Sequence, residues 1–427
     1  MRENKAVFKI VRIACYASFF AFCLWLFYLE ATEVLVSDIP THISQALDES
    51  IETYSVLMVL VATCYRIGSE FAVALLLAVI EIATLLVSEL LMRRLLPDVK
   101  PSVVFACALC CNIAIAIYVP FVHPYLTRGL SCGNAWHNTT YLGMRLSALG
   151  AIWAYLRMCG YLESKRHALD WVVLTLCCLI STAIKPSFMM GFGPAIVILC
   201  VYDLIKEGKR ALPRFAALLV SFAISAAVLA MQYFVLYVGD TSSGIEFGIA
   251  RIWRFYHHCV PIGMLQSYLL PLLVLYGCLR LRCADRNYVF AWVFFIIVLL
   301  IYLLLNETGT RKLHANFGWG LKMGVYYLMI SSVVAFFKIQ KGSSTTRLSS
   351  LYVQTHAMRG SGDCECVVGE DRTLKPQSIS SQADNVTSCR IVELPRAFEI
   401  AAIALFLLHT LSGVLSLASI LVGNGYA

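Results

Sequence analysis

Residues 7–28 read VFKIVRIACYASFFAFCLWLFY, an apolar run long enough to cross a bilayer as one helix. Basic residues precede or open this run at Arg2, Lys5, Lys9 and Arg12. Because cytoplasmic segments are enriched in Lys and Arg, these residues predict a cytoplasmic N-terminus. The run lacks a small-residue cleavage pattern and is the first of many such runs. We therefore interpret it as a retained transmembrane helix and not as a signal peptide.

The composition of the whole chain indicates the same class. Its 427 residues are 59% hydrophobic and 14% charged, with a mean hydropathy of +0.75. These values exclude a soluble globular protein and predict an all-α, polytopic membrane protein. The formal net charge of +8 gathers at the ends of apolar stretches. We interpret this charge as a topology signal, and we expect no nucleic-acid partner.

About eleven apolar stretches have the length of a transmembrane span. They lie near residues 7–29, 71–92, 101–120, 139–159, 170–184, 188–205, 214–237, 265–280, 288–305, 320–338 and 398–422. Basic residues cluster in alternate loops, which predicts that those loops are cytoplasmic and that the C-terminus lies outside. Residues 53–66 are apolar but short before Gly68. They fit either an interfacial or re-entrant helix on the outer face or part of a longer, kinked second span.

Composition divides the chain into three regions. Residues 1–338 are predicted to form the transmembrane bundle, and residues 396–427 the last transmembrane helix. Between them, residues 339–395 are rich in Ser, Thr, Gln, Gly and charge, which predicts a disordered cytoplasmic linker. No region resembles a soluble catalytic domain, so any chemistry belongs to the bundle and its external loops. These loops are predicted at 30–52, 121–139, 238–264 and 306–319.

The cysteines give little evidence of a metal site. Many of the 17 lie inside apolar stretches, where Cys behaves as a small hydrophobic residue. Cys364 and Cys366 form a lone C-x-C pair, and no histidine or second pair stands at ligand spacing. We interpret them as solvated thiols.

The first external loop contains the sequence SDIPTH at residues 37–42, which places a carboxylate and an imidazole at the membrane face. Asp38 is our candidate general base for an acceptor hydroxyl. Helix capping is the alternative, because Ser37 or Asp38 precedes a proline that can begin a helix. His42 lies one turn later on the same helical face, where it can orient a substrate or remain a solvated interfacial residue.

Positive residues on the outer side oppose the usual charge distribution of membrane proteins. Lys185 and Arg311 are the two examples that we single out. A lipid-linked phosphate or diphosphate would offset their cost, since Arg forms bidentate contacts and Lys supplies a point charge. Pairing with a loop carboxylate such as Glu307 is the alternative explanation. Together with Asp38, such a phosphate-binding group has the chemistry needed for glycosyl transfer from a lipid carrier.

The chain resembles the GT-C superfamily of integral membrane glycosyltransferases. It shares with them an acidic residue in the first external loop, a short interfacial helix and nine or ten further spans. SDIPTH at 37–42, GNAWHNTT at 133–140, KPSF at 185–188 and GTRKLHANF at 309–317 also resemble a group of uncharacterised bacterial membrane proteins. The GT-C resemblance implies that Asp38 is the essential acid and that external Arg or Lys residues contact the carrier phosphate. This chain departs from some GT-C members in having no paired acids in the first loop and no large C-terminal extracytoplasmic domain.

The sequence therefore predicts a glycosyltransferase in surface polysaccharide or glycolipid assembly, at the outer face of a bacterial cytoplasmic membrane. Its expected partners are a polyprenyl-phosphate sugar donor, a lipid or polysaccharide acceptor and the lipid bilayer. The catalytic candidates are Asp38 and His42, and the substrate-binding candidates are His137, Asn138, Lys185, Glu307, Arg311, His314 and Asn316. No cofactor is certain; a divalent metal stays an open alternative, although the missing second acid argues against it. A transporter or flippase for a lipid-linked or anionic solute is the leading alternative, and a non-catalytic scaffold is another.

Overall fold

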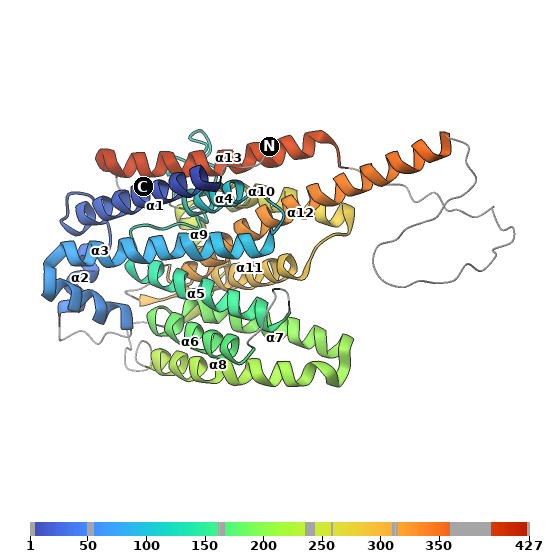
Figure 1. The fold of residues 1–427 in the computed structure, drawn as a ribbon. Coiled ribbons are helices and arrows are strands. Elements are labelled where there is room, and N and C mark those ends of the chain that lie inside the picture. The colour runs from blue at the N-terminus through green and yellow to red at the C-terminus, as the bar shows by residue number, and fades with distance from the viewer. Residues whose placement is uncertain are drawn as a thin grey trace.

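The computed structural model describes residues 5–48, 55–127, 129–160, 162, 167–234, 244–257, 259–309, 312, 315–358 and 394–424. For residues 342–358 it describes the backbone alone. The described chain is almost entirely helical, which confirms the predicted all-α class. Figure 1 shows the long helices running side by side as a bundle. The long helices are α1 (Lys5–Ala31), α3 (Val56–Leu95), α4 (Pro101–Ile113), α5 (Thr139–Met158), α6 (His167–Ile184), α7 (Ser187–Glu207), α8 (Leu212–Tyr233), α10 (Val260–Leu281), α11 (Arg286–Leu304), α12 (Gly318–Met358) and α13 (Arg396–Ser419).

Within the described ranges, seven helical stretches are long and apolar enough to cross a membrane. One of them, Ser187–Tyr233, contains α7, the 3-10 turn η1 (Gly208–Ala211) and α8. The helices Pro101–Ile113 and Ala168–Ile184 are also apolar but shorter. The chain thus has the helices of a multi-pass membrane protein.

Two helices differ from the predicted stretches in ways that bear on the site. Helix α3 begins at Val56 and is kinked at Gly68 and Ser69, where Ser69 has a φ of 53°. This geometry is that of the longer, kinked helix given above as the second possibility for residues 53–66. Helix α12 continues to Met358, so the N-terminal part of the predicted disordered linker is helical. The remainder of that linker, residues 359–393, lies outside the described residues.

The predicted helix at 101–120 is wrong in its second half, because α4 ends at Ile113. The chain then continues through a buried, non-helical segment, residues 114–117. Residues from three other parts of the chain supply its hydrogen bonds: Asn134 Nδ2 donates to the Ala114 carbonyl at 2.7 Å, the Ile115 amide donates to the His409 carbonyl at 3.2 Å, and Gln266 Nε2 donates to the Ile117 carbonyl at 3.0 Å. Non-helical backbone is tolerated at membrane depth only with such partners.

The core of the bundle lies around α5 and α12. In α12, 83% of the most apolar stretch is buried, compared with 22% in α1, which therefore lies at the periphery. On α5, Arg145 forms an ion pair with Glu81 of α3 and donates a hydrogen bond to Asn134. Both charged side chains are buried, and an intramembrane charge is tolerated when it is paired in this way.

At one end of the bundle, short elements lie in the connections between the long helices. Helix α2 (Ile39–Leu47) follows α1, and helix α9 (Arg251–Tyr256) precedes α10. Strand β1 (Ile245–Phe247) pairs antiparallel with β2 (Leu305–Glu307), so that Ile245 lies opposite Glu307. This two-stranded sheet holds the loop before α9 against the loop before α12.

Candidate functional site

Asp38 is positioned at the start of α2, but its carboxylate does not cap that helix. The Ile39 amide donates instead to Ser37 Oγ at 3.1 Å, so the neighbouring serine performs the capping role. Asp38 Oδ2 accepts a hydrogen bond from Asn138 Nδ2 at 3.2 Å and lies 3.8 Å from His137 Nε2. The side chain is 48% exposed, so a substrate can reach its carboxylate. The structure therefore leaves Asp38 available for chemistry.

Asn138 connects this carboxylate to the rest of the site. It is the N-cap of α5, and its Oδ1 accepts from the Tyr141 amide at 3.0 Å and from Thr140 Oγ1 at 2.9 Å. Lys185 Nζ donates to the same Oδ1 at 3.4 Å. With its oxygen engaged by donors, the amide nitrogen of Asn138 faces Asp38. One side chain thus fixes the acid relative to both α5 and the lysine.

Lys185 lies between α6 and α7 and is buried, with 6% of its surface exposed. Its Nζ donates to Thr140 Oγ1 at 2.8 Å and lies 4.5 Å from the centre of the Trp319 ring. Burial lowers the pKa of this ammonium to about 7, against the opposing influence of Asp38 and Glu307. No ion pair forms between Lys185 and a carboxylate of the described residues. An anion beside Lys185 would favour its protonated form.

The two predicted histidines lie near Asp38 and come from different segments, His42 from α2 and His137 from the residues before α5. His42 Nδ1 is 2.6 Å from Thr139 Oγ1 at the start of α5. Burial lowers the pKa of His42 to about 4, with a further contribution from Lys185, and burial also lowers the pKa of His137 to about 4. Both imidazoles are therefore neutral at pH 7 and can serve as hydrogen-bonding groups without adding charge.

Glu307 and Asn316 form a second polar pair next to Lys185. Glu307 ends β2 and is buried, and Asn316 Nδ2 donates to its two carboxylate oxygens at 3.0 and 2.9 Å. The carboxylate also raises the pKa of Lys185, so it lies within electrostatic range of the ammonium. The predicted alternative, a direct pairing of Glu307 with Arg311, lies outside the described residues, as do Arg311 and His314 themselves.

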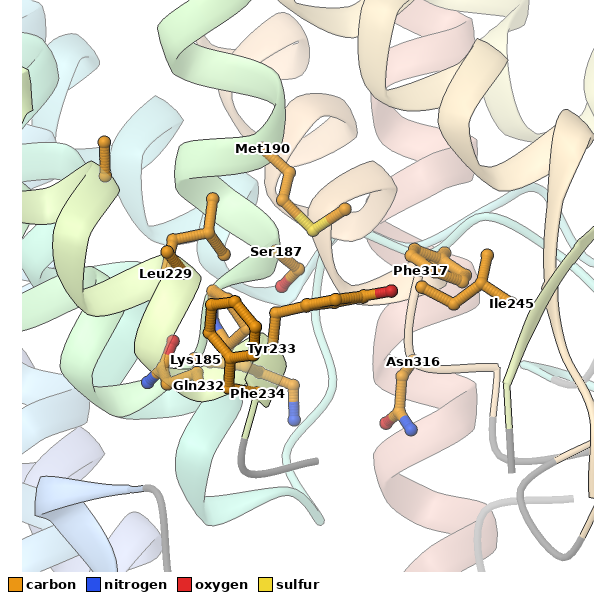
Figure 2. A pocket seen from close by; sticks show the side chains of 13 residues that line it. Lys185, Ser187, Met190, Leu229, Gln232, Tyr233, Phe234, Ile245, Asn316 and Phe317 are labelled. Atoms are coloured by element: carbon orange, nitrogen blue, oxygen red, sulfur yellow. The ribbon is translucent and has the colours of Figure 1, made fainter. Parts of the chain in front are cut away.

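Two cavities lie beside this cluster, one lined by Lys185 and the other by Trp319, whose ring centre is 4.5 Å from Lys185 Nζ. The first, of about 390 Å³, is largely apolar and lies between α7, α8 and the segment before α12. Figure 2 shows its side chains, with Lys185 and Gln232 on one side and Asn316 on the other. The second cavity, of about 580 Å³, is more polar. Its lining includes Asp38, His137, Ser131, Trp253, Trp319 and Lys322.

Sequence reasoning missed several of these residues. Trp319 and Lys322 lie in the first two turns of α12, and neither was assigned to the site. A lysine within an apolar helix was the available signal, because such residues usually face the interior of a bundle. Thr139 and Thr140 also contact His42 and Lys185, as given above. They directly follow the predicted Asn138. Their hydroxyl contacts, however, depend on where α6 and α2 lie relative to α5, which could not be predicted from the sequence.

Charges on the described helices are distributed unequally between the two ends of the bundle. The Asp38 site lies where α1, α6 and α11 end and where α5, α7 and α12 begin. Most of the described arginine and lysine ion pairs near helix ends lie at the opposite end of the bundle, although Arg251 pairs with Glu246 at the Asp38 end. Examples at the opposite end join Arg12 and Arg93 to Glu89, Arg214 and Arg286 to Asp203, and Lys338 to Asp285. Such an asymmetry is typical of a membrane protein with one cytoplasmic face.

Comparison with protein-family models, curated proteins and solved structures finds no match for this chain. Among the described residues, no three His, Cys, Asp or Glu side chains gather in an arrangement that could hold a metal ion.

Proposed function

We propose that this protein is a GT-C-type membrane glycosyltransferase that uses a polyprenyl-phosphate-linked sugar in surface polysaccharide or glycolipid assembly. One observation carries the proposal: Lys185, a buried lysine without a carboxylate ion-pair partner in the described chain, lines an apolar cavity, and its Nζ lies 4.5 Å from the ring centre of Trp319, which lines a polar cavity together with Asp38. A lipid-linked sugar has the same sequence of parts, an apolar chain, a phosphate and a polar ring.

The apolar cavity is the proposed site of the carrier chain. Met190, Leu229 and Phe317 line it, and its polar lining residues include Lys185 and Asn316. An isoprenoid chain buried there would gain about 25 cal/mol per Å² of apolar surface removed from water or headgroups. Its phosphate would then lie at Lys185, where a charge-assisted hydrogen bond can form. Asn316 is the second donor on that side, provided that it exchanges one of its contacts with Glu307.

The chemistry proposed for the polar cavity is displacement at the anomeric carbon. Asp38 accepts the proton of the acceptor hydroxyl, whose oxygen forms a bond to that carbon. The bond between the carbon and the phosphate oxygen breaks, and the electron pair leaves with the phosphate. Lys185 stabilises the resulting charge. Asn138 and His137 orient Asp38, while His42 supports Thr139 at the start of α5.

In the proposed topology, about eleven helices span the membrane, the N-terminus is cytoplasmic and the C-terminus lies outside. The charge asymmetry of the helices supports this arrangement, because most of the arginine ion pairs near helix ends lie at the end away from Asp38. The site would then face the outer surface of a bacterial cytoplasmic membrane, where lipid-linked sugars and acceptors are available to it.

The experiment that tests this function is a surface-glycan profile, measured by mass spectrometry, of cells that lack the protein. These cells are complemented with the wild type or with Asp38→Asn at equal membrane abundance. A missing sugar that the wild type restores and Asp38→Asn does not restore is the expected result. Lys209→Gln is a matched control, since Lys209 is exposed in the 3-10 turn at the opposite end of the bundle. Equal rescue by Asp38→Asn would remove the catalytic role.

The second candidate function, a transporter or flippase, is favoured by the interrupted helix α4. Discontinuous helices with buried polar groups are common around the substrate sites of secondary transporters. Flipping a lipid-linked sugar would use the apolar cavity and Lys185 but not a general base. A fluorescent prenyl-phosphate probe in proteoliposomes discriminates between the two: a transporter changes its leaflet, whereas a transferase consumes a sugar donor without moving the carrier.

A further inference from the structure

The first turns of α12 contribute a second positive charge beside the site. Lys322 lines the polar cavity together with Asp38 and His137, and its Nζ lies 5.6 Å from the centre of the Trp319 ring. Lys185 Nζ lies 4.5 Å from the same ring centre. The two ammonium groups therefore share one indole as a neighbour, although Lys185 lines the apolar cavity and Lys322 the polar one.

Lys322 has no acidic partner among the residues that the structure describes. The arginine and lysine ion pairs of the described chain all join other residues. The acid among the described lining residues of its cavity is Asp38, which contacts Asn138 and His137. A lysine near the membrane interior is costly unless an anion or a water-filled cavity offsets its charge.

The backbone at this position adds to the positive potential. Helix α12 begins at Gly318, and Gly318 and Trp319 both line the polar cavity; their amides donate to the Ala315 and Asn316 carbonyls, so the helix acts on the cavity through its dipole. Helix N-termini carry partial positive charge and favour anions. The helix end and the Lys322 ammonium thus act on the same cavity, which has room for a sugar-sized group at about 580 Å³.

We propose that Lys322 and the N-terminus of α12 form a second oxyanion subsite, so that the protein binds a substrate with an anionic group in addition to the carrier phosphate at Lys185. The inference rests on the proposed carrier function and deepens it. The second oxyanion has two sources with the same chemistry. It is either the second phosphate of a diphosphate carrier or a carboxylate or phosphate on the transferred sugar.

The test measures the affinity of the purified full-length protein in nanodiscs for four probes. These are inorganic phosphate, a short-chain prenyl monophosphate, the matching prenyl diphosphate, and a prenyl monophosphate bearing a uronic acid. The wild type should bind one of the two doubly anionic probes about tenfold or more tightly than the prenyl monophosphate, because a charge-assisted contact is added. Preference for the diphosphate assigns the second anion to the carrier, and preference for the uronic acid assigns it to the sugar.

The variants separate the second subsite from the first. Lys322→Gln should abolish the preference and leave prenyl monophosphate affinity unchanged, whereas Lys322→Arg should retain most of it. Lys322→Gln leaves no described carboxylate without a partner, so it should fold, and Lys209→Gln is the surface control. Equal affinity of the wild type for all three prenyl probes, or a preference that survives Lys322→Gln, overturns the second subsite.

The carrier proposal fails by a different result. If the prenyl chain adds nothing to phosphate affinity, and Lys185→Gln changes no affinity, the lipid-carrier reading is wrong. Inorganic phosphate binding that still depends on Lys322 would then leave the anion subsite standing alone. Loss of that dependence as well would overturn both inferences.

Discussion

Replacing Asn138 separates the stability of the site from its chemistry. Asn138→Ser keeps an N-cap oxygen for the Tyr141 amide but removes the amide that donates to Asp38, whereas Asn138→Ala removes both. Serine and asparagine are nearly equivalent N-caps, and their loss to alanine costs about 1 kcal/mol. We therefore expect the free energy of unfolding of Asn138→Ser to lie within about 0.5 kcal/mol of the wild-type value, and that of Asn138→Ala to be lower by about 1 kcal/mol.

The loss of function in Asn138→Ser follows from the exposure of Asp38. A hydrogen bond to a charged group contributes about 1.5–3 kcal/mol when water cannot replace it. The Asp38 side chain is 48% exposed and the bond is 3.2 Å long, so water replaces part of it. We expect a remaining loss of about 1 kcal/mol, which is roughly a fivefold reduction in transfer rate.

The assay compares glycan restored per unit of membrane protein in complemented cells, alongside thermal unfolding of the purified variants. A serine variant with full transfer would show that Asn138 does not orient Asp38. A serine variant as unstable as the alanine variant would refute the capping argument. Asn138→Asp serves as a third arm, because it keeps the cap while placing a like charge beside Asp38.

Three further outcomes are expected. Prenyl-phosphate affinity should fall as pH rises through about 7, because Lys185 loses its proton there. Lys185→Arg should remove this fall, since Arg stays charged. A wild-type affinity that stays constant from pH 6 to 9 would contradict this prediction. Affinity should not respond to His42 or His137 between pH 5.5 and 7, since their pKa values lie at about 4; His42→Gln should keep the same profile in this range. Arg145→Met should destabilise the fold by about 3–5 kcal/mol in thermal unfolding by leaving Glu81 buried and uncompensated, and the double variant with Glu81→Gln should recover part of that loss.

Sequence patterns were informative wherever one local property decided the structure. Apolar length predicted the helices, and polar residues next to their ends predicted where side chains would gather. Asp38, His137, Asn138 and Lys185 are indeed joined in one cluster, and Glu307 with Asn316 lies beside it. All of these residues lie in the connections between helices. In a bundle of antiparallel helices, alternate connections gather at one end, so residues that flank them can meet there.

The remainder depended on contacts between distant parts of the chain. Residues 101–120 are apolar apart from a few positions such as Ser102 and Asn112, and no proline or glycine follows Ile113 directly to end a helix there. The helix ends there because Asn134, Gln266 and His409 supply competing hydrogen bonds. Lys322 was likewise visible as a charge, but its role depends on the second cavity, which is formed by segments from five regions of the sequence.

The buried pair between Arg145 and Glu81 has a consequence for biosynthesis. The two residues are 64 positions apart, so at about 5–20 residues per second Glu81 emerges from the ribosome several seconds before its partner. During that interval the insertion machinery must accept a helix with an unpaired acid, a cost of about 2.5–3.5 kcal/mol at its centre. Helix α3 has a mean hydropathy of 2.5 in its most apolar stretch, which offsets this cost. Polar substitutions elsewhere in α3 should therefore reduce membrane insertion before they affect the finished protein.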